Sequence, residues 1–214
     1  MSYSSEVLAD SPRFWARLGE SSGTTMNDSS GNARNGIYGN AMTLGQAGAI
    51  SDGDTAIIPS AATSYGKIAG ASWMNTSSWT VEAWVNRKST SSYAYIFTRE
   101  AGPGQTVSTD YIWSLRVNSS GQPSIVVFKG GGAVVLSGAS ALSGNTWYHL
   151  AATLSGSTLT LYVNGVQVAT ESSGGTLSTS SVTDMVVANL RTTGAGDLFA
   201  SIGTSDAGDS VQER

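Results

Sequence analysis

Apolar and polar residues alternate along most of the chain, which is the pattern of strands that bury one face. In segment 78–87, one predicted face consists of Trp79, Val81, Ala83 and Val85. The other face consists of Thr80, Glu82, Trp84 and Asn86. Further strands are predicted at 13–18, 55–58, 92–98, 111–117, 124–129, 133–136 and 185–188. We find no stretch with apolar residues at every third or fourth position over three turns, so the sequence predicts an all-β protein.

The clearest local signal is a predicted hairpin at Asn164-Gly165. Two β-branched runs, 159–163 and 166–169, flank this dipeptide. Asn-Gly favours the type I′ turn because both residues tolerate a positive φ. A preceding run, 147–154, reaches the hairpin through the turn residues 155–157. Together the three runs predict an antiparallel meander.

Turn residues set the predicted domain boundaries. Gly and Ser recur at spacings of roughly 8–12 residues, which is typical of a sandwich or a barrel. Segment 172–181 is rich in Ser and Gly and predicts a surface loop. Segment 201–214 has no periodicity and predicts an irregular tail, either extended along a neighbour or disordered. We therefore assign one domain to residues 1–200 and the C-terminal tail to residues 201–214.

Composition narrows the classes of function. The chain has 214 residues, no Cys, 12% charged residues and a formal net charge of −4. The absence of Cys excludes thiolate chemistry and thiolate metal sites. Basic residues are scattered singly except at Arg87-Lys88, so we expect no nucleic-acid binding, which needs clustered Lys and Arg. The apolar runs are too short to span a bilayer, so no membrane insertion is expected.

Three segments carry a family resemblance. They are 10–20 followed by 28–38 (DSPRFWARLGE and DSSGNARNGIY), 79–85 (WTVEAWV), and 147–151 followed by 161–165 (WYHLA and LYVNG). In this order and at these spacings they resemble the laminin-G-like, concanavalin A-like jelly-roll family, from Asp10 to about Phe199. The resemblance implies an antiparallel jelly-roll sandwich of two sheets.

The resemblance ends at the last strand. Family members usually close with Phe-x-Gly-x-Ile-Asp-Glu-Val, whereas here Phe199-Ala200-Ser201-Ile202 is followed by Gly203-Thr204. We therefore expect the closing strand and its acidic pair to be missing. A sheet edge would then be open to a strand or tail from another chain.

Calcium is the metal that the resemblance implies, through opening-loop oxygens and the closing acid. The hard oxygen donors available here are Asp28 with Asn32, or Asp52 with Asp54. Asp and Asn next to Gly are more often turn formers that cap their own backbone. Because the closing acid is lost, we expect no metal centre and no cofactor.

Segment 44–50 (LGQAGAI), taken with the opening segment, is similar to domains of bacteriophage minor tail and capsid-associated proteins. This similarity implies a virion location, other virion proteins as partners and a homo-oligomer. Residues 1–6 lack the basic region and apolar core of a secretory signal. That is compatible with a cytoplasmic protein or with release by cell lysis.

Candidate catalytic residues are few. His149 is the single histidine and alternates with bulky apolar residues, which predicts a structural role. No Gly-x-Ser-x-Gly motif supports a Ser-His-acid triad. Glycoside hydrolysis needs two carboxylates roughly 5–10 Å apart, but Asp52 and Asp54 lie in a glycine turn and Glu82 stands alone on the Trp84 face. We predict no catalytic residues.

Two other patterns, a glycine-rich stretch and a set of aromatic residues, are relevant to ligand binding. Lys129 followed by three glycines loosely resembles a phosphate cradle, but a strand follows it and not a helix, so it predicts a hairpin turn. Aromatic side chains could stack on sugar rings, and the exposed candidates are Trp73, Tyr93 and Tyr95. The sequence alone does not decide which way these side chains face, so the carbohydrate-binding residues stay unassigned.

The residues and the resemblance together predict a non-catalytic structural or binding module of a bacteriophage virion. It would serve as a minor tail or capsid decoration protein that presents its sandwich to other proteins or to a host surface. The first alternative is a glycan-binding, lectin-like module, and the second is a glycoside hydrolase.

Overall fold

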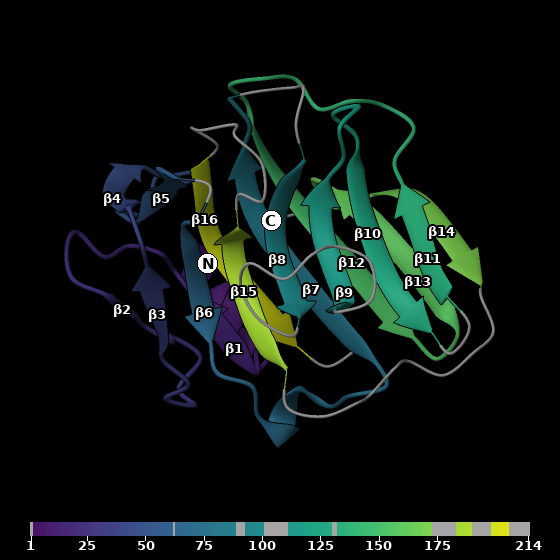
Figure 1. Cartoon of the computed structure of the whole chain (residues 1–214), viewed down its shortest axis with the longest axis horizontal. Helices are drawn as coiled ribbons and strands as arrows, with labels where there is room; N and C mark the ends of the chain where they lie inside the picture. Colours follow the sequence, from purple (N-terminus) through teal and green to yellow (C-terminus); the bar gives the residue numbers. More distant parts are fainter. Residues whose placement is uncertain are drawn as a thin grey trace.

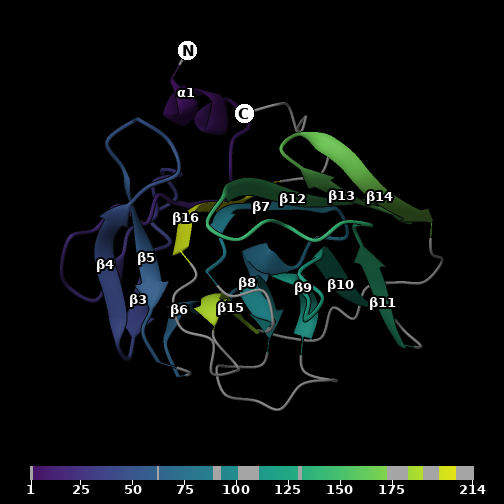
Figure 2. The ribbon, with the colours of Figure 1, turned by 90° about the horizontal axis from the view of Figure 1, so that it is seen from above.

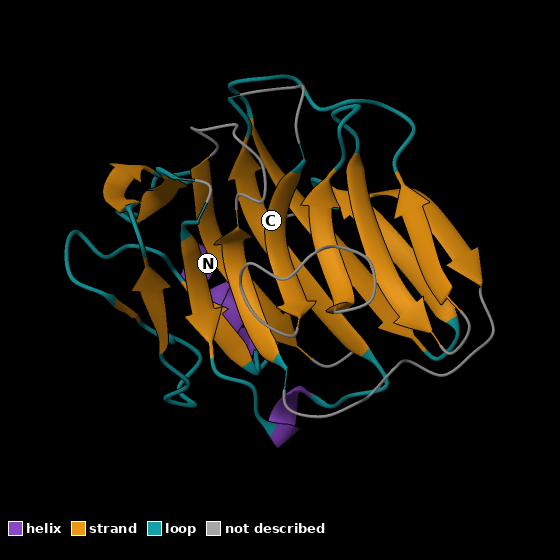
Figure 3. Ribbon diagram, in the orientation of Figure 1, coloured by secondary structure: helices purple, strands orange, loops and turns teal. Residues whose placement is uncertain are grey.

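Two antiparallel β-sheets stack face to face in the computed structural model of the chain (Figures 1 and 2). The structure describes residues 2–61, 63–88, 93–100, 111–129, 132–172, 183–189 and 198–205. Strands make up nearly all of the regular structure in this part of the chain (Figure 3). The predicted all-β sandwich is confirmed.

The first sheet, sheet A, contains the predicted meander at one edge. Its order is β14 (Val166–Ser172), β13 (Thr158–Val163), β12 (Trp147–Ser155), β7 (Trp79–Asn86), β16 (Leu198–Ser205), β5 (Thr55–Pro59) and β4 (Met42–Ala47). The short strand β1 (Phe14–Ala16) also pairs with β16.

The second sheet, sheet B, faces sheet A across the core. Its order is β11 (Gly132–Ser137), β10 (Pro123–Lys129), β9 (Tyr111–Val117), β8 (Ala94–Glu100), β15 (Asp184–Asn189), β6 (Tyr65–Ile68), β3 (Gly36–Gly39) and β2 (Thr25–Met26). A short 3-10 helix, η1 (Ser72–Met74), lies between β6 and β7.

Aromatic side chains fill the space between the two sheets. The ring centroids of Trp79 on β7 and Trp113 on β9 are 5.6 Å apart. Phe97 on β8 meets Trp113 edge to face at 5.2 Å, and Phe14 on β1 lies 6.3 Å from Phe97. Tilted and edge-to-face pairs are favoured by the ring quadrupole, so this cluster ties four strands of the two sheets to one core.

Strand β7 has the two faces that its alternation predicts. Val81, Ala83 and Val85 are buried in the core between the sheets. On the outer face, Trp84 packs with Trp147 around Ala56. The period of two therefore identifies the buried face of this strand correctly.

The predicted hairpin is confirmed. Asn164 and Gly165 both have positive φ, at 49° and 75°, as a type I′ turn requires. The Asn164 side chain also accepts a hydrogen bond from the His149 N–H at 2.9 Å. That bond ties the turn to the neighbouring strand β12.

The expectation of a missing closing strand is wrong. β16 runs from Leu198 to Ser205 and pairs with β7 on one side and with β5 and β1 on the other. It lacks the family's closing pattern. Strand pairing, however, uses the backbone N–H and C=O groups, and neighbouring strands on both sides supply hydrogen-bond partners for them. The strand continues past the boundary drawn at residue 200. Residues 206–214 of the predicted tail, and most of the loop predicted at 172–181, lie outside the described residues.

One helix was not predicted, because two turns are too short for a periodic signal. α1 (Tyr3–Ala9) is capped by the Ser2 side chain, which accepts from the Ser5 N–H, and it lies over the outer face of sheet A (Figure 2). Val7 is buried, and the Trp84 indole N–H donates to the Tyr3 hydroxyl at 3.2 Å.

No described helix is long and apolar enough to cross a membrane. The short strands β2, β3, β4 and β6 were also not predicted.

Replacing the core residue Leu115 is expected to destabilise the protein strongly. Leu115→Ala should lower the free energy of unfolding by about 2–5 kcal/mol, because Leu115 is fully buried and truncation leaves a cavity. Leu8→Ala is the matched control, since Leu8 is 47% exposed and surface changes usually stay within about 0.5 kcal/mol. Urea denaturation measures both values, and equal effects would contradict this assignment of the core.

The meander turn offers a second test. Gly165→Ala should cost about 1–2 kcal/mol because an L-residue disfavours the positive φ at this position. Ser157→Ala, in the exposed turn between β12 and β13, is the control. Thermal denaturation should show a lower Tm for the first variant alone.

Candidate functional site

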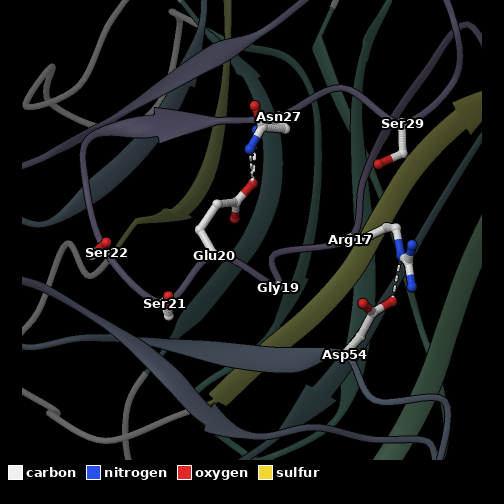
Figure 4. Close-up of a pocket in the computed structure, with 8 residues that line it drawn as sticks. All are labelled: Arg17, Gly19, Glu20, Ser21, Ser22, Asn27, Ser29 and Asp54. Atoms are coloured by element: carbon white, nitrogen blue, oxygen red, sulfur yellow. Dashed lines mark hydrogen bonds and ion pairs between the residues drawn. The ribbon is translucent and has the colours of Figure 1, made fainter.

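An open pocket of about 410 Å³ lies where the opening segment of the chain meets the start of β5 (Figure 4). Its lining is polar apart from one glycine, and consists of Arg17, Gly19, Glu20, Ser21, Ser22, Asn27, Ser29 and Asp54. Residues 17–22 follow β1, residues 27 and 29 follow β2, and Asp54 directly precedes β5. Strands of both sheets therefore position this pocket.

An ion pair forms one side of the pocket. The Arg17 Nε donates to Asp54 Oδ2 at 2.5 Å, and the Arg17 guanidinium lies 5.8 Å from the ring centre of Trp15. Burial raises the pKa of the Asp54 carboxyl, while the Arg17 hydrogen bond and charge act in the opposite direction. One oxygen of Asp54 is thus tied to Arg17, and both side chains have further polar atoms for a ligand.

A second network holds Glu20 on the other side of the pocket (Figure 4). Glu20 Oε1 accepts from the Asn27 N–H at 2.9 Å and from Asn27 Nδ2 at 2.8 Å. Glu20 Oε2 accepts from the Tyr38 hydroxyl at 2.6 Å. Burial raises the pKa of Tyr38, and the hydrogen bond to Glu20 and the Glu20 charge act in the same direction. Tyr38 therefore keeps its proton and acts as the donor.

Asp28 lies beside this pocket and organises the loop behind it. Asp28 Oδ1 accepts from the N–H groups of Trp15 and Ser30, at 3.1 and 2.9 Å. Asp28 Oδ2 accepts from the Arg34 N–H at 2.9 Å. The Asn32 amide donates to the carbonyls of Pro12 and Arg13. These two side chains brace the loop as turn-forming residues.

The candidate calcium donors take part in hydrogen bonds within the loops. N–H donors face both oxygens of Asp28, and a guanidinium occupies one oxygen of Asp54. Asp52 Oδ1 accepts from the Asp54 N–H at 3.0 Å. Calcium binds oxygen atoms only, and at Asp28 and at Asp54 Oδ2 it would share these atoms with N–H donors. No group of three His, Cys, Asp or Glu that could hold a metal occurs within the described ranges.

Two carboxylates, those of Glu20 and Asp54, line the pocket, and a pair of carboxylates is also what glycoside hydrolysis requires. Glycoside hydrolysis needs one carboxyl as a proton donor and a second that is free to attack or to activate water. Both Glu20 oxygens already accept hydrogen bonds, and Asp54 is paired with Arg17. The arrangement suits hydrogen bonding to hydroxyl groups better than bond cleavage.

His149 and Glu82 meet on the outer face of sheet A. His149 Nε2 lies 3.4 Å from Glu82 Oε2, and the His149 ring centroid lies 5.3 Å from that of Trp84. His149 is 1% exposed. This described contact thus joins a carboxylate to a buried imidazole and not to a second carboxylate.

The aromatic candidates for sugar stacking are already packed against other groups. The Arg34 guanidinium lies 4.1 Å from the ring centre of half-buried Trp73. Tyr93 stacks on Tyr95 at 6.0 Å, and Arg116 lies 5.1 Å from the Tyr93 ring. None of these three aromatic residues lines the pocket of Figure 4.

A strand and not a helix follows the glycine-rich stretch after Lys129, as predicted. Lys129 ends β10 and pairs with Gly132 at the start of β11. The two residues between them lie outside the described ranges. No helix follows this turn, because β11 begins directly at Gly132.

Sequence reasoning did not identify Arg17, Glu20 or Asn27. Arg17 lies in the strand predicted at 13–18, and Glu20 and Asn27 lie in the turn-rich stretch after it. Single polar residues in such positions carry no local signal of a binding site. The available signal was the resemblance itself, since residues 10–20 and 28–38 include or adjoin all three.

Residues 60–201 match the concanavalin A-like lectin/glucanases superfamily. The chain belongs to this family. No curated protein sequence matches the chain. The matched range includes β7 and the meander, where it agrees with the resemblance, whereas the opening segment lies outside it.

Solved structures share the fold at low identity. The receptor binding domain of botulinum neurotoxin D is 11% identical, with a TM-score of 0.66, and the match covers 94% of this chain and 51% of that one. The Trypanosoma rangeli sialidase in complex with sialic acid is 10% identical, with a TM-score of 0.62, and the match covers 92% of this chain and 31% of that one. The chain thus spans about half or a third of the length of these proteins. At such identities the likeness shows the fold alone.

Removing the Asp28 carboxylate should loosen the loop behind the pocket. Asp28→Ala is expected to lower the free energy of unfolding by about 2 kcal/mol, because three N–H groups lose a charged acceptor. Asp52→Ala removes one such bond in an exposed turn and should cost less. Chemical denaturation compares the two variants, and a larger loss for Asp52→Ala would show that Asp28 does not organise the loop.

Proposed function

We propose that the chain is a non-catalytic binding module of a bacteriophage virion, and that its opening-loop pocket binds hydroxyl groups of a host-surface glycan. The module works without a cofactor. It acts as a rigid platform within a minor tail or capsid decoration protein.

The observation that carries this proposal is the chemistry of the pocket lining. A sugar hydroxyl both donates and accepts hydrogen bonds, so its site needs acceptors and donors side by side. Glu20 and Asp54 offer acceptors, Arg17 and Asn27 offer donors, and Ser29 offers both. The Glu20–Asn27 and Arg17–Asp54 contacts hold these groups in place (Figure 4), which lowers the entropy cost of binding.

The arrangement of the pocket carboxylates supports binding over catalysis, whereas the fold is compatible with both. The family includes lectins as well as glucanases by its description, and the similar structures include a receptor binding domain and a sialidase. Among the described residues that line the pocket, the second carboxylate is Asp54, and its pairing with Arg17 leaves Glu20 without the free partner carboxylate that hydrolysis needs.

The virion setting rests on sequence similarity to phage tail and capsid-associated domains in the opening segment and in segment 44–50. Most of segment 44–50 lies in β4, at the end of sheet A. In this setting other virion proteins and further copies of the chain are the protein partners. Mass spectrometry of purified particles, with the chain found among their structural proteins, tests this part. Absence of the chain from particles would refute the setting and leave the pocket proposal standing.

The pocket proposal is tested with a glycan array and then calorimetry on a bound glycan. Ser29→Ala should weaken binding about two- to tenfold, since one hydrogen bond contributes about 0.5–1.5 kcal/mol. Ser119→Ala, in the exposed turn before β10, is the matched control and should bind like the parent protein. If the parent protein bound no glycan, or if both serine variants bound equally, glycan binding at this pocket would be ruled out.

A further inference from the structure

The charges around the pocket define a narrower class of ligand, an inference that rests on the proposed function. Three of the eight lining residues are ionisable, namely Arg17, Glu20 and Asp54. One is basic and two are acidic, so with all three ionised the lining has a formal charge of −1. A ligand in the pocket responds chiefly to the charges that no neighbouring group of opposite charge compensates.

The charge of Arg17 is already compensated. Its Nε donates a charge-assisted hydrogen bond to Asp54 Oδ2 at 2.5 Å. The pair is partly exposed, with relative side-chain exposures of 38% and 20%. An acidic ligand that came to Arg17 would therefore compete with a carboxylate that is already in place.

The charge of Glu20 is not compensated in this way. The groups that donate to Glu20 in the described part of the chain are the Asn27 backbone and amide and the Tyr38 hydroxyl. All are neutral, and Tyr38 keeps its proton because its pKa is raised. These bonds orient the carboxylate without cancelling its charge, so the unbalanced charge that faces the pocket is negative.

We propose that this pocket selects neutral saccharides, and that Glu20 is the residue that excludes acidic sugars such as those bearing a carboxylate. A carboxylate on the ligand would be repelled by Glu20, whereas a hydroxyl group can donate to the same oxygens. Because the pocket is open to water, the repulsion is moderate and is screened by salt.

The experiment uses the full chain and a glycan array that contains matched pairs, each a neutral glycan and the same glycan extended by sialic acid. At low ionic strength we expect the neutral member to bind about three- to tenfold more tightly, a difference that shrinks as salt is added, since the Debye length falls from roughly 30 Å at 0.01 M to 8 Å at 0.15 M. Glu20→Gln keeps the size of the side chain and removes its charge. This variant should bring the ratio between the two members close to one.

Glu171→Gln is the matched control, because it makes the same change at an exposed position of β14, at the other end of sheet A from β5 and outside the pocket lining. It should keep the ratio of the parent protein. Equal denaturation midpoints for the parent and both variants show that the fold is retained.

The outcomes separate this inference from the function on which it rests. If no glycan of either kind binds, the proposed function fails. If glycans bind but the acidic members bind as well as or better than the neutral ones, or if Glu20→Gln leaves the ratio unchanged, selection by Glu20 is overturned.

Discussion

Backbone pairing of β16 is the interaction on which the arrangement of this sandwich depends. β16 joins the central strand β7 to β5, and it is the described strand to which β1 pairs. Phe14 of β1 therefore reaches Phe97 and the core, although its partner Thr204 lies almost at the other end of the chain. Contacts of such high sequence separation carry a loop-closure cost that local contacts do not. The opening loop, and with it the pocket, is thus placed by the last described strand.

The acidic residues around the opening loop serve different purposes, and their partners decide which. Asp28 faces backbone N–H groups and holds the loop together. Asp54 faces a guanidinium and fixes the start of β5 against the segment after β1. Glu20 faces neutral donors and keeps its charge toward the pocket. Three carboxylates in one region therefore have three different sets of hydrogen-bond donors.

Membership of the family accounts for the sandwich fold but does not identify which ligand, if any site on it binds one, the protein takes. A widespread fold carries many functions, and function resides in local sites on it. The outer face of sheet A illustrates this point, because Glu82, Trp84 and His149 gather there but are packed against one another. The opening-loop pocket instead presents polar atoms to solvent. A comparison of folds alone would not distinguish these two places.

The sequence by itself determined the secondary structure wherever side-chain pattern and backbone preference agree. The period of two identified the buried face of β7, and Asn164-Gly165 placed the hairpin, because both signals are local. The closing strand β16 and the site residues Arg17, Glu20 and Asn27 were decided only by the tertiary structure. β16 is a strand because β7 and β5 supply hydrogen-bond partners on both sides. The pocket exists because strands of both sheets bring together side chains that lie up to 37 positions apart in the sequence, as Arg17 and Asp54 do. Neither property is encoded in a local pattern, since both arise from contacts between distant segments.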